Sequence, residues 1–291
     1  MNVNLSNSTV AVVGLGLMGG SLALALAGKC ARRVGVASRP EVARAAVARQ
    51  VVDNATCDLA GAVRQADVVV LATPVRHIIS VMPEVAAHMR PDALLMDVGS
   101  TKGAVVEAME ALPEGPVTVG GHPMCGKETG GLDSADPALF EGAAFVLVPT
   151  ARTTPGALAL ASALAEAVGA RPLVMDAHTH DRAVAIVSHL PYVLACALMH
   201  AQMHAAGEDQ AADLLPAGGF RDTTRLAASE VDMMLDVLLT NRPAIEQALD
   251  LFTAQLAQAR ALLGEPEPEP EPSGLLAWIE RAQIRRREMF R

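Results

Sequence analysis

A glycine-rich turn near the start of the chain has the residue types and spacing of a pyrophosphate-binding site. The segment Gly14-Leu-Gly-Leu-Met-Gly19 follows the apolar run 9–13 and leads into the apolar run 21–27. In such a strand–turn–helix unit the three glycines permit the turn, let the backbone approach the phosphates, and let helix and strand pack closely. A glycine turn in an α/β protein that binds no nucleotide is the alternative. The residues expected to contact a dinucleotide are Gly14, Gly16, Leu17, Met18 and Gly19.

The residues after the second predicted strand bear on which dinucleotide is bound. NAD sites of this type usually carry Asp or Glu there, where the carboxylate bonds the ribose hydroxyls. Here the strand 33–36 is followed by Ala37-Ser-Arg39, so a hydroxyl and a guanidinium take that place. Arg39 can pair with a 2′-phosphate, and Ser38 can donate another hydrogen bond. The pattern favours NADP, and NAD stays possible if Glu41 serves the ribose instead.

Polar segments follow several of the other predicted strands and helices. Ligands of an open α/β sheet bind outside the carboxyl ends of its strands, so these segments are candidate binding sites. Thr73-Pro74 is expected to cover the nicotinamide half of the cofactor. The other segments are Asp97-Val-Gly-Ser-Thr-Lys102, Gly120-Gly-His-Pro-Met-Cys-Gly-Lys-Glu128, Ser188-His-Leu-Pro191 and Gly218-Gly-Phe-Arg-Asp-Thr-Thr-Arg225.

A sheet of parallel strands is needed to bring these segments together. Short apolar runs alternate with helical patterns through the first half, which is typical of parallel βαβ units. Strands are predicted at 10–13, 33–36, 68–71, 94–97, 117–120, 144–148 and 171–175, and helices at 18–27, 41–50, 76–88, 102–111 and 155–168. After residue 176 the pattern becomes long Ala/Leu-rich helices, at 180–206 and 224–263. The predicted fold class is α/β, with an N-terminal Rossmann-type dinucleotide-binding domain followed by an all-helical domain.

Changes in composition give the predicted domain boundaries. The dinucleotide-binding domain is assigned to residues 1–175 and the helical domain to residues 176–264. Residues 265–274 hold an alternating Glu-Pro tract, expected to be an extended linker, and 275–291 a C-terminal amphipathic tail helix. Because the long helices are too apolar for isolated exposure, the helical domain is expected to form a dimer interface.

Charge and cysteine usage limit the partners. The 291 residues carry a formal net charge of −9, which argues against binding to nucleic acid or to anionic membrane surfaces. The four cysteines show no disulfide or metal-ligand spacing, and the N-terminus lacks the regions of a signal peptide. His200 and His204 share a helical face, but no HExxH pattern is present, so no metal is predicted. We expect a cytoplasmic protein with a small-molecule substrate.

Taken together, these segments resemble the prephenate/arogenate dehydrogenase family of tyrosine biosynthesis. The matching elements are the glycine turn, DxxSxK at 97–102, GGHPMxGxE at 120–128, SHLP at 188–191 and GGFRDTTR at 218–225. They occur in the family's order over residues 9–242. The resemblance implies a homodimer that carries out the oxidative decarboxylation of arogenate or prephenate with hydride transfer to NADP. Hydride leaves C4 of the substrate ring, carbon dioxide leaves C1, and aromatisation drives both.

The resemblance also implies roles for individual residues. His122 would be the base at the substrate hydroxyl, because a neutral imidazole accepts a proton near pH 7. Ser100 would bond the same hydroxyl, orient His122 and contact the cofactor. Arg225 is suited to the substrate carboxylate through its bidentate fork. The remaining substrate-binding residues are His189 at the side chain, Glu128 as a gate that pairs with Arg225, and Arg221 as a second cation.

Each of these assignments has a structural alternative. His122 could cap a strand end, His189 could be a buried helix histidine, and Ser100 could be the N-cap of the next helix. Arg225 could be a surface partner of Asp222. Three further residues are predicted to lie outside the chemistry: Lys102 as a surface lysine, and His178 and His180 as linker or cap residues.

Two other functions stay open. A β-hydroxyacid dehydrogenase shares the glycine opening, but it needs a catalytic lysine in the helical domain, and Lys127 is the last lysine of this chain. A catalytically silent NADP-binding sensor would have lost His122, Ser100 and Arg225, which are all present.

Overall fold

The computed structural model describes residues 4–208, 211–264 and 274–290. The chain forms two compact units, residues 1–242 and 243–291. The first unit holds the sheet and the helical segments as far as α11, and the second holds most of α12(Arg242–Leu263) and α13(Gly274–Met289). The predicted linker at 265–274 lies outside the described residues, except that Gly274 begins α13. The predicted tail helix at 275–291 coincides with α13 to within two residues at the described end.

One sheet of eight strands organises the first unit, in the order β3-β2-β1-β4-β5-β6-β7-β8. The strands are β1(Thr9–Val13), β2(Arg32–Val36), β3(Asn54–Thr56), β4(Val68–Leu71), β5(Leu94–Asp97), β6(Val117–Pro123), β7(Ala144–Pro149) and β8(Arg171–Val174). Every neighbouring pair is parallel except β6 and β7, which are antiparallel and align His122 with Val146. The Rossmann-type prediction is therefore confirmed, but the expectation of parallel pairing fails at β6–β7.

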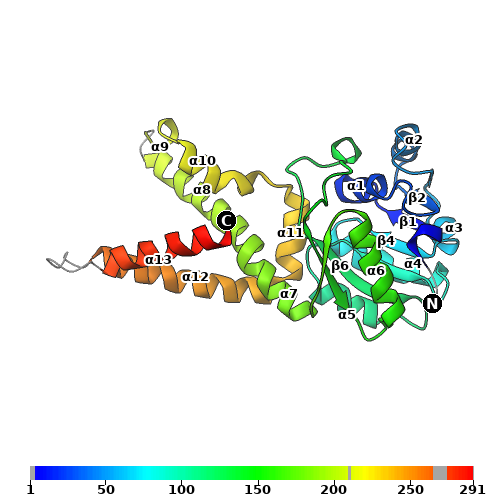
Figure 1. Cartoon of the computed structure of the whole chain (residues 1–291). Coiled ribbons are helices and arrows are strands. Elements are labelled where there is room, and N and C mark those ends of the chain that lie inside the picture. Colours follow the sequence, from blue (N-terminus) through cyan, green and yellow to red (C-terminus); the bar gives the residue numbers. More distant parts are fainter. Residues whose placement is uncertain (1–3, 209–210, 265–273, 291) are drawn as a thin grey trace. The chain divides into compact units, whose positions relative to one another are not determined.

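Helices cover both faces of the sheet (Figure 1). They are α1(Leu17–Ala25), α2(Pro40–Ala48), α3(Leu59–Arg64), α4(Val75–His88), α5(Gly103–Glu110) and α6(Pro155–Ala167). Successive side chains of β1 point to opposite faces of the sheet, and each face packs against a different layer of helices. Val10 and Val12 share a core with α1, α2 and α6, whereas Ala11 and Val13 share a core with α3, α4 and α5. The two apolar faces explain why the central strands β1, β4 and β5 are buried almost completely, whereas the edge strands β3 and β8 are partly exposed.

Two elements of the first half were missed by the sequence patterns. The strand β3 has only three residues, and the helix α3 that follows it has six, so neither shows a clear period. Asp58 begins α3 by accepting a hydrogen bond from the backbone of Gly61. The strand β6 is also longer than predicted, and it extends through His122 to Pro123. His122 is consequently held by a strand.

The helical segment begins with one nearly continuous run. It consists of α7(Ala177–Val184), a π-helical turn η3(Ala185–His189) and α8(Leu190–Glu208), followed by α9(Ala211–Leu214), α10(Gly218–Thr224), the 3-10 turn η4(Arg225–Ala228) and α11(Val231–Thr240). The single helix predicted at 224–263 is wrong, because the helical backbone breaks at Ser229 and again at Asn241. Pro243, in the first turn of α12, is compatible with a new helix start but not with a helix interior.

The run Ala177–Gly207 is long and apolar enough to span a membrane by length and composition alone. Its first half carries buried polar residues, His180, Asp181 and His189. His180 bonds to His122 of β6 and to Asp181, Asp181 accepts from the backbone at the start of α5, and His189 lies beside Asn241. Such contacts are those of a helix packed within a protein.

Candidate active site

Two glycines of the turn have no room for a side chain, whereas the third faces open space. Gly14 has φ +100°, and a Cβ there would lie 2.7 Å from the carbonyl oxygen of Ala72. A Cβ on Gly19 would lie 1.9 Å from the carbonyl oxygen of Gly14, so α1 could not approach β1 with a larger residue. A Cβ on Gly16 would meet no protein atom within 4 Å. The protein itself thus requires Gly14 and Gly19, whereas the space at Gly16 fits the close approach of a dinucleotide pyrophosphate.

The loops after β4 and β2 lie at the same edge of the sheet as this turn. The Cβ direction of Gly14 points at the Thr73 side chain, which places the loop after β4 against the turn. Thr73 Oγ1 bonds to His77 Nδ1 at 3.0 Å, and Pro74 is exposed at the start of α4. After β2, Ser38 and Arg39 are both exposed, and Arg39 Nε is 3.7 Å from Glu41 Oε1. These residues lie beyond the carboxyl ends of β2 and β4, the edge at which an open α/β sheet binds its ligands.

Lys102 is fully buried, so its prediction as a surface lysine is wrong. Its Nζ pairs with Asp97 at the end of β5 and donates to the carbonyl oxygen of Gly121 at 2.6 Å. The other oxygen of Asp97 accepts the N–H of Gly121 at 3.0 Å. Burial lowers the pKa of Lys102, and the charge of Asp97 opposes that effect. This pair joins β5 to β6 directly beside His122.

The helix α5 is capped by a residue from the helical segment. Both oxygens of Asp181 accept backbone N–H groups, from Lys102 at 2.8 Å and from Gly103 at 2.7 Å. The alternative in which Ser100 is the N-cap is therefore wrong, since Lys102 occupies that position. Burial alone would raise the pKa of Asp181, but His180 and the two backbone N–H groups together bring it below its ordinary value. Asp181 is held as a carboxylate at a helix N-terminus, where negative charge is favourable.

Two histidines and Asp181 form a hydrogen-bonded chain that ends at His122. His180 Nδ1 is 2.8 Å from Asp181 Oδ1, and His180 Nε2 is 2.8 Å from His122 Nδ1. The two rings meet edge to face at 75°. The prediction that His180 is a linker or cap residue is wrong, because its side chain is buried in this chain of bonds. In the sequence, the only sign of this role is that His180 directly precedes Asp181, which is a weak signal by itself.

The bond network assigns the proton positions. A carboxylate only accepts, so His180 donates from Nδ1 to Asp181, and its Nε2 faces Nδ1 of His122 as the acceptor of that bond. His122 accordingly donates from Nδ1, which leaves a lone pair on its own Nε2. Burial and the neighbouring charges of His180, Lys102 and His189 hold the pKa of His122 well below its ordinary value. The structure thus presents His122 as a neutral imidazole with an acceptor nitrogen at neutral pH.

His189 lies in the π-helical turn η3 and is only 2% exposed. Asn241 Nδ2, at the end of α11, donates to the backbone oxygen of Asp181 at 2.8 Å and lies 3.1 Å from His189 Nδ1. Burial lowers the pKa of His189 to about 4. The geometry favours the alternative of a buried histidine, and a direct contact with substrate stays a prediction. Asn241 was not foreseen, since no motif marked it. A π-turn of this kind is frequent at functional sites.

Arg225 and Glu128 form an ion pair between η4 and the loop after β6. The alternative partner for Arg225, Asp222, is not the one that the structure shows. Lys127, next to Glu128, pairs with Asp136 Oδ2 at 2.7 Å, and Arg221 is exposed on α10, one turn before Arg225. Ser100 is partly buried and, within the described part of the chain, forms no hydrogen bond with His122. The predicted site side chains thus fall into a buried group around His122 and an exposed ion pair between Arg225 of η4 and Glu128.

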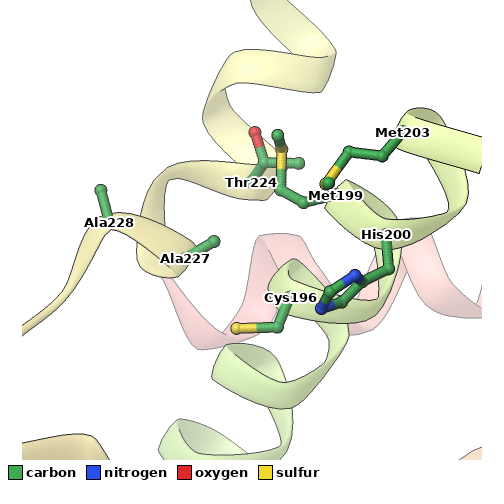
Figure 2. Close-up of a pocket in the computed structure, with 7 residues that line it drawn as sticks. All are labelled: Cys196, Met199, His200, Met203, Thr224, Ala227 and Ala228. Atoms are coloured by element: carbon green, nitrogen blue, oxygen red, sulfur yellow. The ribbon is translucent and has the colours of Figure 1, made fainter. Parts of the chain in front are cut away.

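A cavity of about 370 Å³ lies between α8 and the α10–η4 segment (Figure 2). Its lining residues are Cys196, Met199, His200, Met203, Thr224, Ala227 and Ala228. None of them belongs to the predicted site, although Thr224 and Ala227 flank Arg225. Among the described residues there is no cluster of three or more histidines, cysteines or carboxylates that could hold a metal ion. The cavity is therefore distinct from the strand-end site.

These arrangements suit proton abstraction beside a bound dinucleotide. A neutral histidine is oriented by a second histidine and a carboxylate, which is how a general base is held in one tautomer. A glycine turn with open space at Gly16 lies at the same edge of the sheet. The exposed Arg225, paired with Glu128 in the loop after β6, supplies a cation for an acidic substrate.

Comparisons with known proteins agree along the whole chain. Residues 22–174 match the family model described as prephenate dehydrogenase, nucleotide-binding domain, and residues 176–279 match prephenate dehydrogenase, dimerization domain. The cyclohexadienyl dehydrogenase of Zymomonas mobilis is 35% identical over 263 residues, which cover 89% of each chain.

Two solved structures share both fold and sequence with this chain. The prephenate dehydrogenase of A. aeolicus, in complex with hydroxyphenyl propionate and NAD+, has a TM-score of 0.91 and 31% identity, covering 99% of this chain and 100% of that one. The arogenate dehydrogenase of Synechocystis has a TM-score of 0.84 and 31% identity, covering 97% and 99%. The three relatives differ in the substrate for which each is named.

Proposed function

Because this chain belongs to the prephenate dehydrogenase family, we propose that it catalyses the oxidative decarboxylation of arogenate or prephenate, a step of tyrosine biosynthesis, with NADP preferred over NAD. The observation that carries the proposal is the chain of bonds Asp181–His180–His122, which leaves the acceptor nitrogen of His122 available. A silent sensor would have no need of a buried, oriented base. When bound, the nicotinamide accepts the hydride from C4 of the substrate.

His122 is the base in this proposal. Its Nε2 accepts the proton of the substrate hydroxyl as C4 loses its hydride. The electron pair of the C1–carboxylate bond enters the ring as carbon dioxide leaves, and the phenolate oxygen of the aromatic product then takes the proton back from His122. While it holds that proton, His122 carries a positive charge. Its Nδ1 hydrogen bond to His180 and the negative charge of Asp181 stabilise that charge. A base oriented in this way contributes about 10²–10⁴ to the rate. Ser100 is proposed to bond the same hydroxyl, and its partly buried place at the end of β5 supports that role.

Arg225 is the proposed partner of the substrate carboxylate. Its ion pair with Glu128 joins η4 to the loop after β6, and both side chains are more than half exposed, so the pair can open. Glu128 is thus the proposed gate, since substrate must take its place on the guanidinium. Arg221 is proposed as a second cation, and His189 as a contact for the substrate side chain.

The preference for NADP rests on the residues after β2. Ser38 and Arg39 occupy the place of the usual carboxylate, and both are exposed to a ligand. The 3.7 Å separation between Arg39 and Glu41 is a loose pair that a 2′-phosphate can replace. NAD stays the alternative if Glu41 serves the ribose instead. The proposed cofactor contacts are Gly14, Gly16, Leu17, Met18, Gly19, Ser38, Arg39, Thr73, Pro74 and Ser100.

The choice between the two substrates depends on the side chain, which is an amino acid in arogenate and a keto acid in prephenate. An additional free cation would favour the keto acid. Lys127 is the nearest lysine to this region in sequence, and its ion pair with Asp136 compensates its charge. That pairing removes Lys127 as a cation for the keto acid, while Arg221 remains a candidate for that role. The reason to prefer arogenate is the Ser38-Arg39 pattern, which resembles that of NADP-dependent arogenate members of the family.

A homodimer and a cytoplasmic location are part of the proposal. Exposed apolar side chains on the helical segment, Val187, Met203, Leu214, Leu215 and Val231, support a surface covered by a second copy. The domain boundary between residues 175 and 176 is supported by the two family models, which adjoin there. Sedimentation at micromolar concentration is expected to give a dimer, and Met203→Glu to weaken it. A monomer that is fully active would contradict the dimer.

Initial rates with each substrate and each cofactor test the proposed function. Arogenate and prephenate are each combined with NADP and NAD, and the formation of reduced cofactor is followed by absorbance. An advantage of more than about tenfold in kcat/KM, roughly 1.4 kcal/mol, assigns the preferred pair. Arogenate with NADP is the expected result. Turnover of neither substrate would contradict the function and favour the sensor.

A further inference from the structure

The helix α4 begins without a cap of its own. Its N-cap position is Pro74, which has no side chain able to accept a hydrogen bond. The second helical residue, Arg76, instead donates its backbone N–H to Asp236 Oδ2 at 3.0 Å, across 160 residues of sequence. Arg76 Nε also donates to Asp236 Oδ1 at 2.5 Å. A carboxylate of α11 therefore performs the capping that the local sequence of α4 cannot.

Asp236 is buried on a helix whose outer face is apolar. It is 5% exposed and lies between the buried residues Met234 and Val237, whereas Met233 and Leu235 of the same helix are exposed. Burying a carboxylate is costly unless it is paired and hydrogen-bonded. The contacts with α4 supply both requirements, so this acidic residue is explained by the helix that it caps.

The same helix bonds to the other parts of the site. Thr240, at its end, has its hydroxyl 2.8 Å from the hydroxyl of Thr101, in the loop after β5. Asn241, the next residue, bonds to the backbone of Asp181 and lies beside His189. The helix α11 consequently touches the start of α4, the loop after β5 and the helix that carries His180. These are the elements whose relative positions decide where a cofactor lies with respect to His122.

We infer that Asp236 is a positioning residue, whose cap on α4 fixes the Thr73-Pro74 loop and with it the place of the nicotinamide relative to His122. The inference rests on the proposed function for the identity of the bound group. Thr73 is tied to α4 through its bond with His77, so the loop moves with the helix start. Reacting atoms must lie about 3–3.5 Å apart, and a misplacement of 1 Å can cost about 100-fold in rate.

Variants at position 236 separate capping from charge. Asn caps a helix as well as Asp does, and Ala does not. Asp236→Asn is therefore expected to keep kcat within about threefold of the wild type, and Asp236→Ala to lose about 10- to 100-fold in kcat with little change in the dissociation constant of NADPH. Asp232→Asn, on the exposed first turn of α11, is the matched control for charge and is expected to behave as wild type.

Hydrogen exchange gives a readout independent of turnover. In the free protein, the amides of residues 75–78 are expected to exchange faster in Asp236→Ala than in wild type, with Asp236→Asn close to wild type. If Asn and Ala are equally impaired, the effect is one of charge and the cap is wrong. If Asp236→Ala only lowers the melting temperature while the folded enzyme keeps wild-type kcat, the positioning role is wrong. If the wild type turns over neither substrate, the proposed function fails, while exchange still decides the cap.

Discussion

The glycine turn and the group around His122 are built in opposite ways. The turn is a continuous stretch of six residues, and its task is performed by backbone atoms and by the absence of side chains. The group around His122 draws on β5, β6, α7, the π-turn and α11, and its task is performed by side chains. His122 and His180 are 58 residues apart in sequence, and Lys102 and Asp181 are 79 apart.

This difference decides what each region can tolerate. A site formed by backbone atoms needs room around its glycines, so adding a side-chain atom there should impair packing or ligand binding. An assembled site depends on proton positions and partners, so its residues fail when a hydrogen bond is removed. The predictions below test whether the two regions are in fact separable.

Removal of the base should give the largest effect and leave the turn unaffected. His122→Gln keeps a polar side chain of similar size but cannot act as a base near neutral pH. We expect kcat to fall about 1,000-fold, roughly 4 kcal/mol, with the dissociation constant of NADPH unchanged. Stopped-flow rates and a fluorescence titration of NADPH measure the two quantities. His200→Gln, in the separate cavity, is the control. A decrease of less than tenfold for His122→Gln would contradict its role.

Acid should weaken the assembled region before it affects the turn. The pKa of His189 is about 4 in the folded protein, below its ordinary value of 6.5, and the pKa of His122 is lowered as well. Between pH 6.5 and about 4 the unfolded chain binds a proton at His189 that the folded protein does not. The free energy of unfolding therefore falls as the pH is lowered from about 7 to 4. His189 alone contributes at most about 3 kcal/mol.

Urea denaturation at pH 7, 5.5 and 4.5 measures this dependence. In His189→Asn the slope between pH 7 and 4.5 should be smaller, because one of the two histidines with a lowered pKa is gone. An unchanged slope would show that His189 does not titrate as described.

Two alanine substitutions should separate packing from ligand space within the turn. Gly19→Ala places a methyl group against the oxygen of Gly14, so it should lower the free energy of unfolding by about 1–3 kcal/mol. Gly16→Ala meets no protein atom, so it should leave the melting temperature unchanged and raise the KM of the dinucleotide. Thermal unfolding with and without NADPH compares them. Equal destabilisation by both would refute the distinction.

The smallest expected effect is on the choice of dinucleotide. Arg39→Gln removes the cation proposed for the 2′-phosphate and keeps the side chain polar. The ratio of kcat/KM for NADP to that for NAD should fall about tenfold, or 1.4 kcal/mol, while the rate with NAD stays the same. Arg44→Gln, on the same helix–loop region, is the charge control. An unchanged ratio would leave Glu41 and the ribose as the better explanation.

The sequence by itself determined the regular elements and the cofactor turn. Alternating strands and helices predicted the Rossmann-type order, because apolar periodicity is a local property of the chain. Gly14 and Gly19 were predicted as residues that a tight turn and close packing require, and two features within the turn agree, the positive φ of Gly14 and the approach of a Gly19 Cβ to the oxygen of Gly14. The antiparallel β7 escaped because strand pairing depends on contacts between distant segments. The break at Asn241 had a local signal, Pro243, which the prediction of one helix overlooked.

Only the tertiary structure decided the environment of each polar side chain. Lys102 is predicted from its neighbours as a surface residue, but the end of β5 and the backbone of Gly121 enclose it. Asp181 and Asp236 look like ordinary helical acids in the sequence, yet each caps a helix that is distant in the chain. Burial and hydrogen-bond partners set the charge and the tautomer of a side chain, and both arise only when remote segments pack together.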